Sequence, residues 1–261
     1  MHAVATHSWP YPRWIAHRGA GQLAPENTLA AFRRGASHGY RMFECDVKLS
    51  ADGIPFLLHD ATLQRTTNAV KALGRGLSAV AGDHPWSTLS LLDAGSWHSA
   101  SFTGETLPTL EAIASYCRHN NFHLNIEIKA TPGTERHTGE VVARHAARLW
   151  HGAAVPPLLS SFDVDSLEGA HHAQPELPRG LLLEHLWSGW LETALNLDCS
   201  AVIADQSLWD GASVTQAHSA GLHCASYTVN AEDDAQRLWA LGLDALITDR
   251  VDTFNPASPC A

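Results

Sequence analysis

The sequence contains no run of about 18 apolar residues, so no segment is expected to cross a membrane as a helix. It also lacks an excess of positive charge, because 17 Lys and Arg residues stand against 27 Asp and Glu, a formal net charge of −10. Nucleic acid and an anionic membrane surface are therefore not expected as main partners. An anionic substrate would need a few local cations or a bound metal ion.

Cysteine is sparse, and its pattern argues against a disulfide framework and against a thiolate zinc site. The five residues are widely spaced, odd in number and form no CxxC pair: Cys45, Cys117, Cys199, Cys224 and Cys260. This usage favours reduced thiols over a disulfide framework or a thiolate zinc site. The first residues also lack the basic segment and apolar run of a secretory signal. We therefore expect a cytoplasmic protein.

Apolar residues make up 45% of the 261 residues, enough to fill a core, and they recur in an alternating pattern. Short β-prone runs are predicted at 14–17, 42–47, 124–128, 158–162, 180–183, 201–204, 223–229 and 245–248. Helix-like stretches separate them near 27–38, 109–119, 135–150, 164–173, 188–196, 208–219 and 231–241. Eight strands alternating with helices predict an α/β fold with parallel pairing. A TIM (β/α)8 barrel over residues 1–261 is the leading candidate, and an open doubly wound sheet is the second.

Two segments break the alternation. In residues 42–60, two β-like runs flank Asp52-Gly53, which predicts a hairpin whose returning arm, 55–59, is antiparallel and not a further barrel strand. Residues 61–106 are rich in turn residues and too long for a plain loop, which predicts a small inserted subdomain of short helices after strand two.

Polar side chains gather at the carboxyl ends of the first strands, where barrel active sites lie. Because side chains alternate along a strand, Glu44 and Asp46 share one face of their strand, and Glu127 and Lys129 share one face of theirs. Residues that pair across the hairpin should have numbers summing to roughly 104, which brings His59 beside Glu44 and Asp46. Barrel closure should add His17 and Arg18 from the first strand. These polar side chains are expected to form one site.

Three converging carboxylates, Glu44, Asp46 and Glu127, repel one another unless a cation lies between them. A ligand set of oxygens alone favours Mg²⁺ or Ca²⁺, with Mn²⁺ also possible, over zinc. The alternative is that each carboxylate pairs separately with Arg or Lys at the barrel mouth.

His17 and His59 flank the predicted metal site, and imidazoles can act as general base and acid near neutrality. Arg18 and Lys129 can hold a phosphate, neutralise the carboxylates, or do both. This combination indicates phosphoester cleavage. Glu26 lies in the segment that opens the first helix, where the partial positive charge of the helix N-terminus favours a carboxylate. An additional supporting role in the site is the alternative. No GxxxxGK[ST] nucleotide loop occurs.

The chain resembles the glycerophosphodiester phosphodiesterase family, in its bacterial cytosolic form. The matching stretches, in order, are IAHRGAGQLAPENTLAAF (15–32), FECDVKLSADGIPFLLHDATLQRTTN (43–68), LDAGSW (92–97), LPTLEAI (107–113), LNIEIK (124–129), LSSF (159–162), YTVN (227–230) and ALITDRVD (245–252). The resemblance implies a TIM barrel with a helical insertion after strand two, and hydrolysis of a glycerophosphodiester to sn-glycerol 3-phosphate and an alcohol.

The resemblance also implies roles for individual residues. The catalytic histidines fall on His17 and His59, the metal ligands on Glu44, Asp46 and Glu127, and the phosphate contacts on Arg18 and Lys129. Tyr227 stands where the family commonly has Trp, so an aromatic wall is kept and a hydroxyl is added. Phe162 is a further lining candidate.

Three rival functions are compatible with parts of this pattern. A lyase like sphingomyelinase D would share the histidine pair and metal but release a cyclic phosphate. A non-catalytic binding module on the same barrel would be expected to lack a member of the site, and all are present. A metal-dependent amidohydrolase is weaker, because its usual His-rich metal set is missing. The preferred alcohol, the metal and the oligomeric state are not specified by the sequence.

Overall fold

A computed structural model of the chain describes residues 9–74 and 78–257, and its strands form one nine-stranded sheet. The strands are β1 (Trp14–Ala16), β2 (Met42–Leu49), β3 (Pro55–Leu57), β4 (His123–Ile128), β5 (Leu158–Ser161), β6 (Arg179–Leu183), β7 (Ala201–Asp205), β8 (His223–Tyr227) and β9 (Ala245–Thr248). The order is β1-β9-β8-β7-β6-β5-β4-β2-β3, and an additional parallel pairing of β1 with β2 closes the ring. All strands but β3 are parallel, so the predicted TIM barrel is confirmed.

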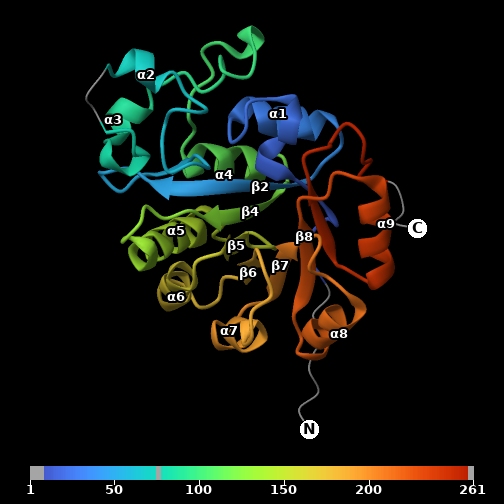
Figure 1. The fold of residues 1–261 in the computed structure, drawn as a ribbon. Coiled ribbons are helices and arrows are strands. Elements are labelled where there is room, and N and C mark those ends of the chain that lie inside the picture. Colours follow the sequence, from blue (N-terminus) through green and yellow to red (C-terminus); the bar gives the residue numbers. More distant parts are fainter. Residues whose placement is uncertain (1–8, 75–77, 258–261) are drawn as a thin grey trace.

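Helices surround the barrel on the outside (Figure 1). The helices are α1 (Leu29–Ser37), α2 (Ala69–Ala72), α3 (Trp86–Leu89), α4 (Leu110–His119), α5 (Glu135–Leu149), α6 (Val164–Ala173), α7 (Trp190–Asn196), α8 (Gly211–Ser219) and α9 (Glu232–Leu241). At some helix ends that differ from the sequence prediction, local capping gives the reason. For example, α8 begins at Gly211 and not near 208, because the Asp210 side chain accepts a hydrogen bond from the Ser213 N–H in a capping box. Within the described ranges, no helix is long and apolar enough to span a bilayer.

The hairpin that follows β2 has the predicted register. β3 pairs antiparallel with β2 through Val47↔Leu57 and Leu49↔Pro55, so paired numbers sum to 104. The regular strand ends at Leu57, two residues earlier than expected, although the N–H of Leu58 still donates to the Asp46 carbonyl at 3.1 Å. This register carries His59 back toward the acidic residues of β2.

The segment between β3 and α4 contains α2, α3 and short 3₁₀ turns, and it has an apolar cluster of its own. The buried members of that cluster are Phe56, Leu58, Leu63, Ala69, Ala81, Leu89, Leu92, Ala94 and Leu107. Because Phe56 belongs to β3, the insertion is packed directly on the hairpin that follows β2. Figure 1 shows α2 and α3 beside β2, outside the ring of barrel helices.

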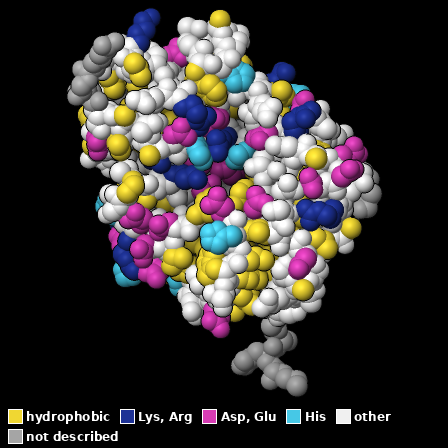
Figure 2. Space-filling view, viewed as in Figure 1, with side chains coloured by type: hydrophobic (Ala, Val, Ile, Leu, Met, Phe, Trp, Pro, Cys, Tyr) yellow, Lys and Arg dark blue, Asp and Glu magenta, His cyan; other side chains and the backbone are white. Residues whose placement is uncertain are grey.

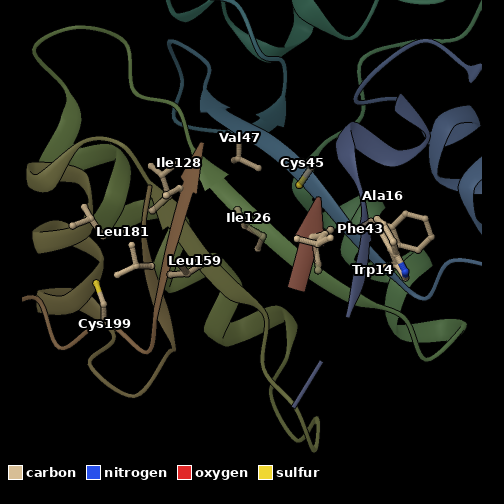
Figure 3. Close-up of a cluster of buried hydrophobic side chains, with 14 of the residues drawn as sticks. Trp14, Ala16, Phe43, Cys45, Val47, Ile126, Ile128, Leu159, Leu181 and Cys199 are labelled. Carbon is tan, nitrogen blue, oxygen red and sulfur yellow. The ribbon is translucent and has the colours of Figure 1, made fainter. Parts of the chain in front are cut away.

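Side-chain alternation along β2 separates two environments. Phe43, Cys45 and Val47 point outward into the apolar layer between the sheet and the helices, as Figure 3 shows together with their neighbours from β4 and β5. Met42 lies in a second apolar cluster inside the barrel, and Tyr11 packs against the same cluster. The intervening polar residues of β2 therefore face the barrel interior above an apolar floor.

Arg179 of β6 is a charged residue that the apolar layer encloses almost completely, at 1% exposure. Its guanidinium donates to the backbone carbonyls of Leu177, Pro175, Leu197 and Asp198 at 2.6–3.0 Å. These carbonyls belong to the α6–β6 and α7–β7 connections. Arg179 thus satisfies buried acceptors that would otherwise be orphaned.

We predict that Arg179→Met lowers the free energy of unfolding by about 3 kcal/mol, because it leaves several buried carbonyls without a donor. Denaturant unfolding followed by circular dichroism measures the change. Arg136→Met is the matched control, since Arg136 forms only an exposed ion pair with Glu168 and should cost about 1 kcal/mol at most. Equal unfolding midpoints for the two variants would contradict this account of Arg179.

Candidate active site

The polar residues of β2 and β4 form successive levels inside the barrel. The parallel register pairs Glu44 with Asn125 and Asp46 with Glu127, and Lys129 follows Glu127 by two residues. They open on a cavity of about 170 Å³ at the carboxyl ends of the strands. The cavity is lined by His17, Arg18, Glu44, His59, Asn125, Glu127, Lys129, Phe162, Leu182, Tyr227, Thr228 and Ile247. Figure 2 shows cationic, acidic and histidine side chains gathered at the centre of this face.

Glu44, Asp46 and Glu127 each offer a carboxylate oxygen, and these three atoms lie within 4.8 Å of one another. All three residues are buried, at 2%, 1% and 8% exposure. Burial and the Asp46 carboxylate raise the pKa of Glu44 to about 8 and that of Glu127 to about 7. Burial opposes ionisation of Asp46 too, but Arg18, His59 and Lys129 outweigh it, and the pKa of Asp46 is lowered. Without a cation, Glu44 and Glu127 are therefore partly protonated near neutral pH, whereas Asp46 is ionised.

The residues present fit a hard divalent cation. Among the described residues, no group hydrogen-bonds to the buried Oε1 of Glu44, so this oxygen is free to act as a ligand. The converging donors are all oxygens, the type that Mg²⁺, Ca²⁺ and Mn²⁺ prefer. A bound cation would also remove the repulsion that keeps Glu44 and Glu127 protonated.

Arg18 and Lys129 pair with the same acidic cluster. The Nζ of Lys129 lies 2.5 Å from Oε1 of Glu127 and 3.8 Å from Oδ1 of Asp46. The Nε of Arg18 lies 3.4 Å from Oδ2 of Asp46, and its Nη1 donates to Glu26 at 2.9 Å. Both cations line the cavity, so pairing with carboxylates leaves them within reach of an anionic ligand. Lys48, buried beside Lys129, has its pKa lowered to about 8 by burial.

His17 is held by the residue that follows the last barrel strand. Its Nδ1 lies 2.7 Å from Oδ1 of Asp249, which directly follows β9, and its Nε2 lies 3.8 Å from Oε2 of Glu44. The side chain of Asn230 donates to the other oxygen of Asp249 at 2.9 Å and accepts from the Asp249 N–H. Burial would lower the pKa of His17, but Asp249 and Glu44 outweigh it and the pKa is raised. Asp249 therefore orients His17 with Nε2 toward the cavity.

The loop that carries His17 has a constrained backbone. Arg18 adopts φ 49° and ψ 30°, in the left-handed region, and its N–H donates to Oε2 of Glu44 at 2.9 Å. Gly21, at φ 55°, lies so close to Asp249 that a Cβ would come within 2.2 Å of its backbone. Only glycine fits there, and its small size lets the loop pack directly against the residue that follows β9.

His59 is held in the same way by a different carboxylate. Its Nδ1 lies 2.9 Å from Oδ1 of the adjacent Asp60. Burial is the largest influence on His59 and lowers its pKa. Because Nδ1 is engaged in both histidines, Nε2 is the ring nitrogen that each one leaves for the cavity.

Three further residues were not identified as site residues from the sequence. Asn27, expected only as part of a helix start, donates to Oδ2 of Asp46 at 2.7 Å and accepts from the Asp46 N–H. The helix cap itself is Thr28. Asn125 is buried in the cavity wall, and its Oδ1 has no hydrogen-bond partner among the described residues. Asp249 could have been found, because it ends a strand just as His17 does.

Phe162 and Tyr227 form an aromatic part of the cavity wall, next to Lys129. Their ring centroids are 5.6 Å apart in an edge-to-face arrangement, and the Nζ of Lys129 lies 5.2 Å from the centroid of Phe162. The hydroxyl of Tyr227 donates to the Leu183 carbonyl at 2.9 Å. The hydroxyl that distinguishes Tyr227 from the Trp common in the family therefore forms a hydrogen bond within the protein.

The closed barrel and its acidic, histidine-flanked cavity are those of a TIM-barrel enzyme. The model of the glycerophosphoryl diester phosphodiesterase family matches residues 17–253. The chain belongs to this family.

Individual relatives agree with this assignment over most of their length. The chain is 31% identical over 245 residues to a glycerophosphodiester phosphodiesterase of Caldanaerobacter subterraneus subsp. tengcongensis, covering 92% of this chain and 95% of that protein. It is 30% identical over 255 residues to a glycerophosphodiester phosphodiesterase of Bacillus subtilis, covering 92% and 84%. Among solved structures, an Oleispira antarctica phosphodiesterase in complex with the product sn-glycerol-3-phosphate is similar with a TM-score of 0.81 and 34% identity, over 92% and 93% of the two chains.

Proposed function

We propose that this chain hydrolyses glycerophosphodiesters to sn-glycerol 3-phosphate and a free alcohol, in a reaction that depends on a divalent cation. The observation that carries the proposal is the convergence of three buried carboxylates, two imidazoles and two cationic side chains on one cavity. Membership of the family and the product bound to the Oleispira antarctica relative support the same substrate class.

The cation would be held by Glu44, Asp46 and Glu127. When bound, it supplies positive charge that polarises the phosphoryl group. Arg18 and Lys129 would then turn toward the phosphate oxygens, because the cation takes over neutralisation of the carboxylates. Mg²⁺ and Ca²⁺ are the favoured ions, and Mn²⁺ is a further candidate.

His17 and His59 would move the protons. Each presents Nε2 to the cavity because a carboxylate occupies its Nδ1. One imidazole takes a proton from the nucleophile, which is either water or a hydroxyl of the glycerol, and the other gives a proton to the departing alcohol oxygen. Phe162 and Tyr227 would pack against the alcohol, the part of the substrate that varies.

The proposed location is the cytoplasm. The four cysteines in the described ranges, Cys45, Cys117, Cys199 and Cys224, are buried free thiols, which is consistent with a reducing compartment.

A panel of substrates and metals tests the activity. Glycerophosphocholine, glycerophosphoethanolamine, glycerophosphoglycerol and glycerophosphoinositol are each incubated with Mg²⁺, Ca²⁺ or Mn²⁺, and release of sn-glycerol 3-phosphate is measured. We expect cation-dependent release from at least one diester. Failure of every combination would refute the proposed function. Phosphorus NMR of the early product adds a second criterion, because a persistent cyclic phosphate would identify a lyase and not a hydrolase.

A further inference from the structure

Arg65, from the first part of the insertion, binds two carboxylates at once, and each of them contacts a residue that lines the cavity. Its Nη1 and Nη2 donate to the two oxygens of Glu26 at 2.8 Å. Its Nε and Nη2 donate to the two oxygens of Asp60 at 2.7 and 2.8 Å. One guanidinium thus forms two bidentate ion pairs, which are the most directional contacts available to this side chain.

The two carboxylates lead to two different site residues. Asp60 contacts Nδ1 of His59 at 2.9 Å, and Glu26 accepts from Nη1 of Arg18 at 2.9 Å. Arg65 is therefore the central member of a continuous chain of hydrogen bonds from Arg18 to His59. Neither neighbour of Arg65 in this chain belongs to the proposed metal ligands.

The need for such a contact follows from the position of His59. This residue lies beyond the end of β3, where ladder hydrogen bonds no longer fix the backbone. Its partner Asp60 is adjacent in sequence and, within the described residues, has no other hydrogen-bond donor than His59 and Arg65. Without Arg65, Asp60 could rotate into solvent, and His59 would lose the acceptor that selects its tautomer.

We infer that Arg65 is a positioning residue that holds Asp60, and through it His59, in the orientation that presents Nε2 to the cavity, with Glu26 as its anchor. The inference rests on the proposed function. It assigns to the insertion a part in the active site, because Arg65 is supplied by the segment that follows β3. The direction of the pKa changes agrees with this geometry. The hydrogen bonds from Arg65 are the largest influence on Asp60 and hold the pKa of that carboxyl far below its usual range.

A double-mutant cycle tests the coupling. Arg65→Gln is expected to lower kcat about 10-fold with little change in KM, as loss of a supporting partner does elsewhere. Asp60→Asn should have a similar or larger effect. The double variant should be no slower than Asp60→Asn alone, because both changes interrupt the same hydrogen-bond chain from Arg65 through Asp60 to His59. Additive losses with a raised KM would overturn the inference and indicate direct substrate contact by Arg65.

Two further variants separate geometry from charge and from general damage. Arg65→Lys should remain close to Arg65→Gln, because an ammonium group cannot grip two carboxylates bidentately. Full activity in Arg65→Lys would overturn the inference, since charge alone would then suffice. Arg144→Gln is the matched control, because Arg144 pairs only with Glu140 on the outside of α5 and should retain normal kcat.

A readout without turnover distinguishes this inference from the proposed function. Nitrogen-15 NMR of the imidazole rings, in cation-free protein, should show neutral His59 protonated at Nδ1 in the wild type and a mixture of tautomers in Arg65→Gln. An unchanged spectrum would overturn the inference even in an active enzyme. Conversely, a wild type without phosphodiesterase activity would refute the proposed function, while the imidazole signals would still report whether Arg65 holds His59.

Discussion

Replacing either histidine of the cavity is expected to abolish most of the activity. We predict that His17→Ala and His59→Ala each lower kcat by at least about 100-fold with an unactivated alcohol as leaving group, because each removes a proton carrier. KM should change far less, since the cationic and acidic residues remain. Release of sn-glycerol 3-phosphate from glycerophosphocholine under saturating cation measures the effect.

The choice of substrate can then separate the two histidines. A p-nitrophenolate leaving group departs without protonation, so the variant that lacks the general acid should recover on such a diester, whereas the variant that lacks the base should not. His172→Ala, on the exposed end of α6, is the control and should retain full activity. If both cavity variants turned over glycerophosphocholine at the wild-type rate, the acid–base roles proposed for His17 and His59 would be wrong.

The barrel could be predicted because its signals are local and repeat along the chain. Most of the β-prone runs are short and followed by an amphipathic stretch, and only a few architectures bury such a pattern. The hairpin register was also predictable, since Asp52-Gly53 marks the turn and the pairing sum of 104 follows from it. That local geometry brings His59 back toward Glu44 and Asp46.

The residues that hold the histidines from distant parts of the chain, Asp249 directly and Arg65 through Asp60, were harder to predict, because barrel closure and the insertion bring them there. Asp249 lies 232 residues from His17 in sequence, and the two meet only because β1 pairs with β9. Arg65 stands in a segment without helix or strand periodicity, so no pattern placed its side chain. Asn27 was hard to recognise for a different reason: it lies at the start of the predicted helix, where a polar residue is usually a cap, whereas here the cap is Thr28 and Asn27 binds Asp46.

Removal of the divalent cation is expected to have an effect as large as loss of a histidine. We predict that chelation lowers phosphodiesterase activity by at least about 100-fold, since a bound cation contributes several kcal/mol of charge stabilisation. Activity should return on addition of Mg²⁺, Ca²⁺ or Mn²⁺. Full activity after exhaustive chelation, with metal content verified by elemental analysis, would contradict the role proposed for Glu44, Asp46 and Glu127.

The raised pKa values of Glu44 and Glu127 make cation binding depend on pH. In the cation-free protein, Glu44 holds a proton below pH about 8 and Glu127 holds one below pH about 7. These protons must leave before the oxygens can act as ligands. Affinity should therefore be about 500-fold higher at pH 8 than at pH 6, because both carboxyls must lose their protons. Isothermal titration calorimetry in buffers of different ionisation enthalpy should detect proton release on binding. His17→Asn serves as the control that removes the nearest imidazole from the proton count.

The same carboxyls should make the cation-free fold less stable as pH rises. Their folded pKa values lie above the ordinary value of 4.5, so the folded state binds more protons than the unfolded state between pH about 5 and 8, and stability falls with increasing pH in that window. Glu44→Gln keeps the shape of the protonated side chain and cannot ionise. We therefore expect this variant to melt at a higher temperature than the wild type in chelator at pH 8, with little difference at pH 5, while it loses cation affinity and activity. A lower melting temperature at pH 8 would show that the carboxylate of Glu44 stabilises the fold without a cation, and that the acidic cluster is a structural ion-pair network and not a site held ready for a metal.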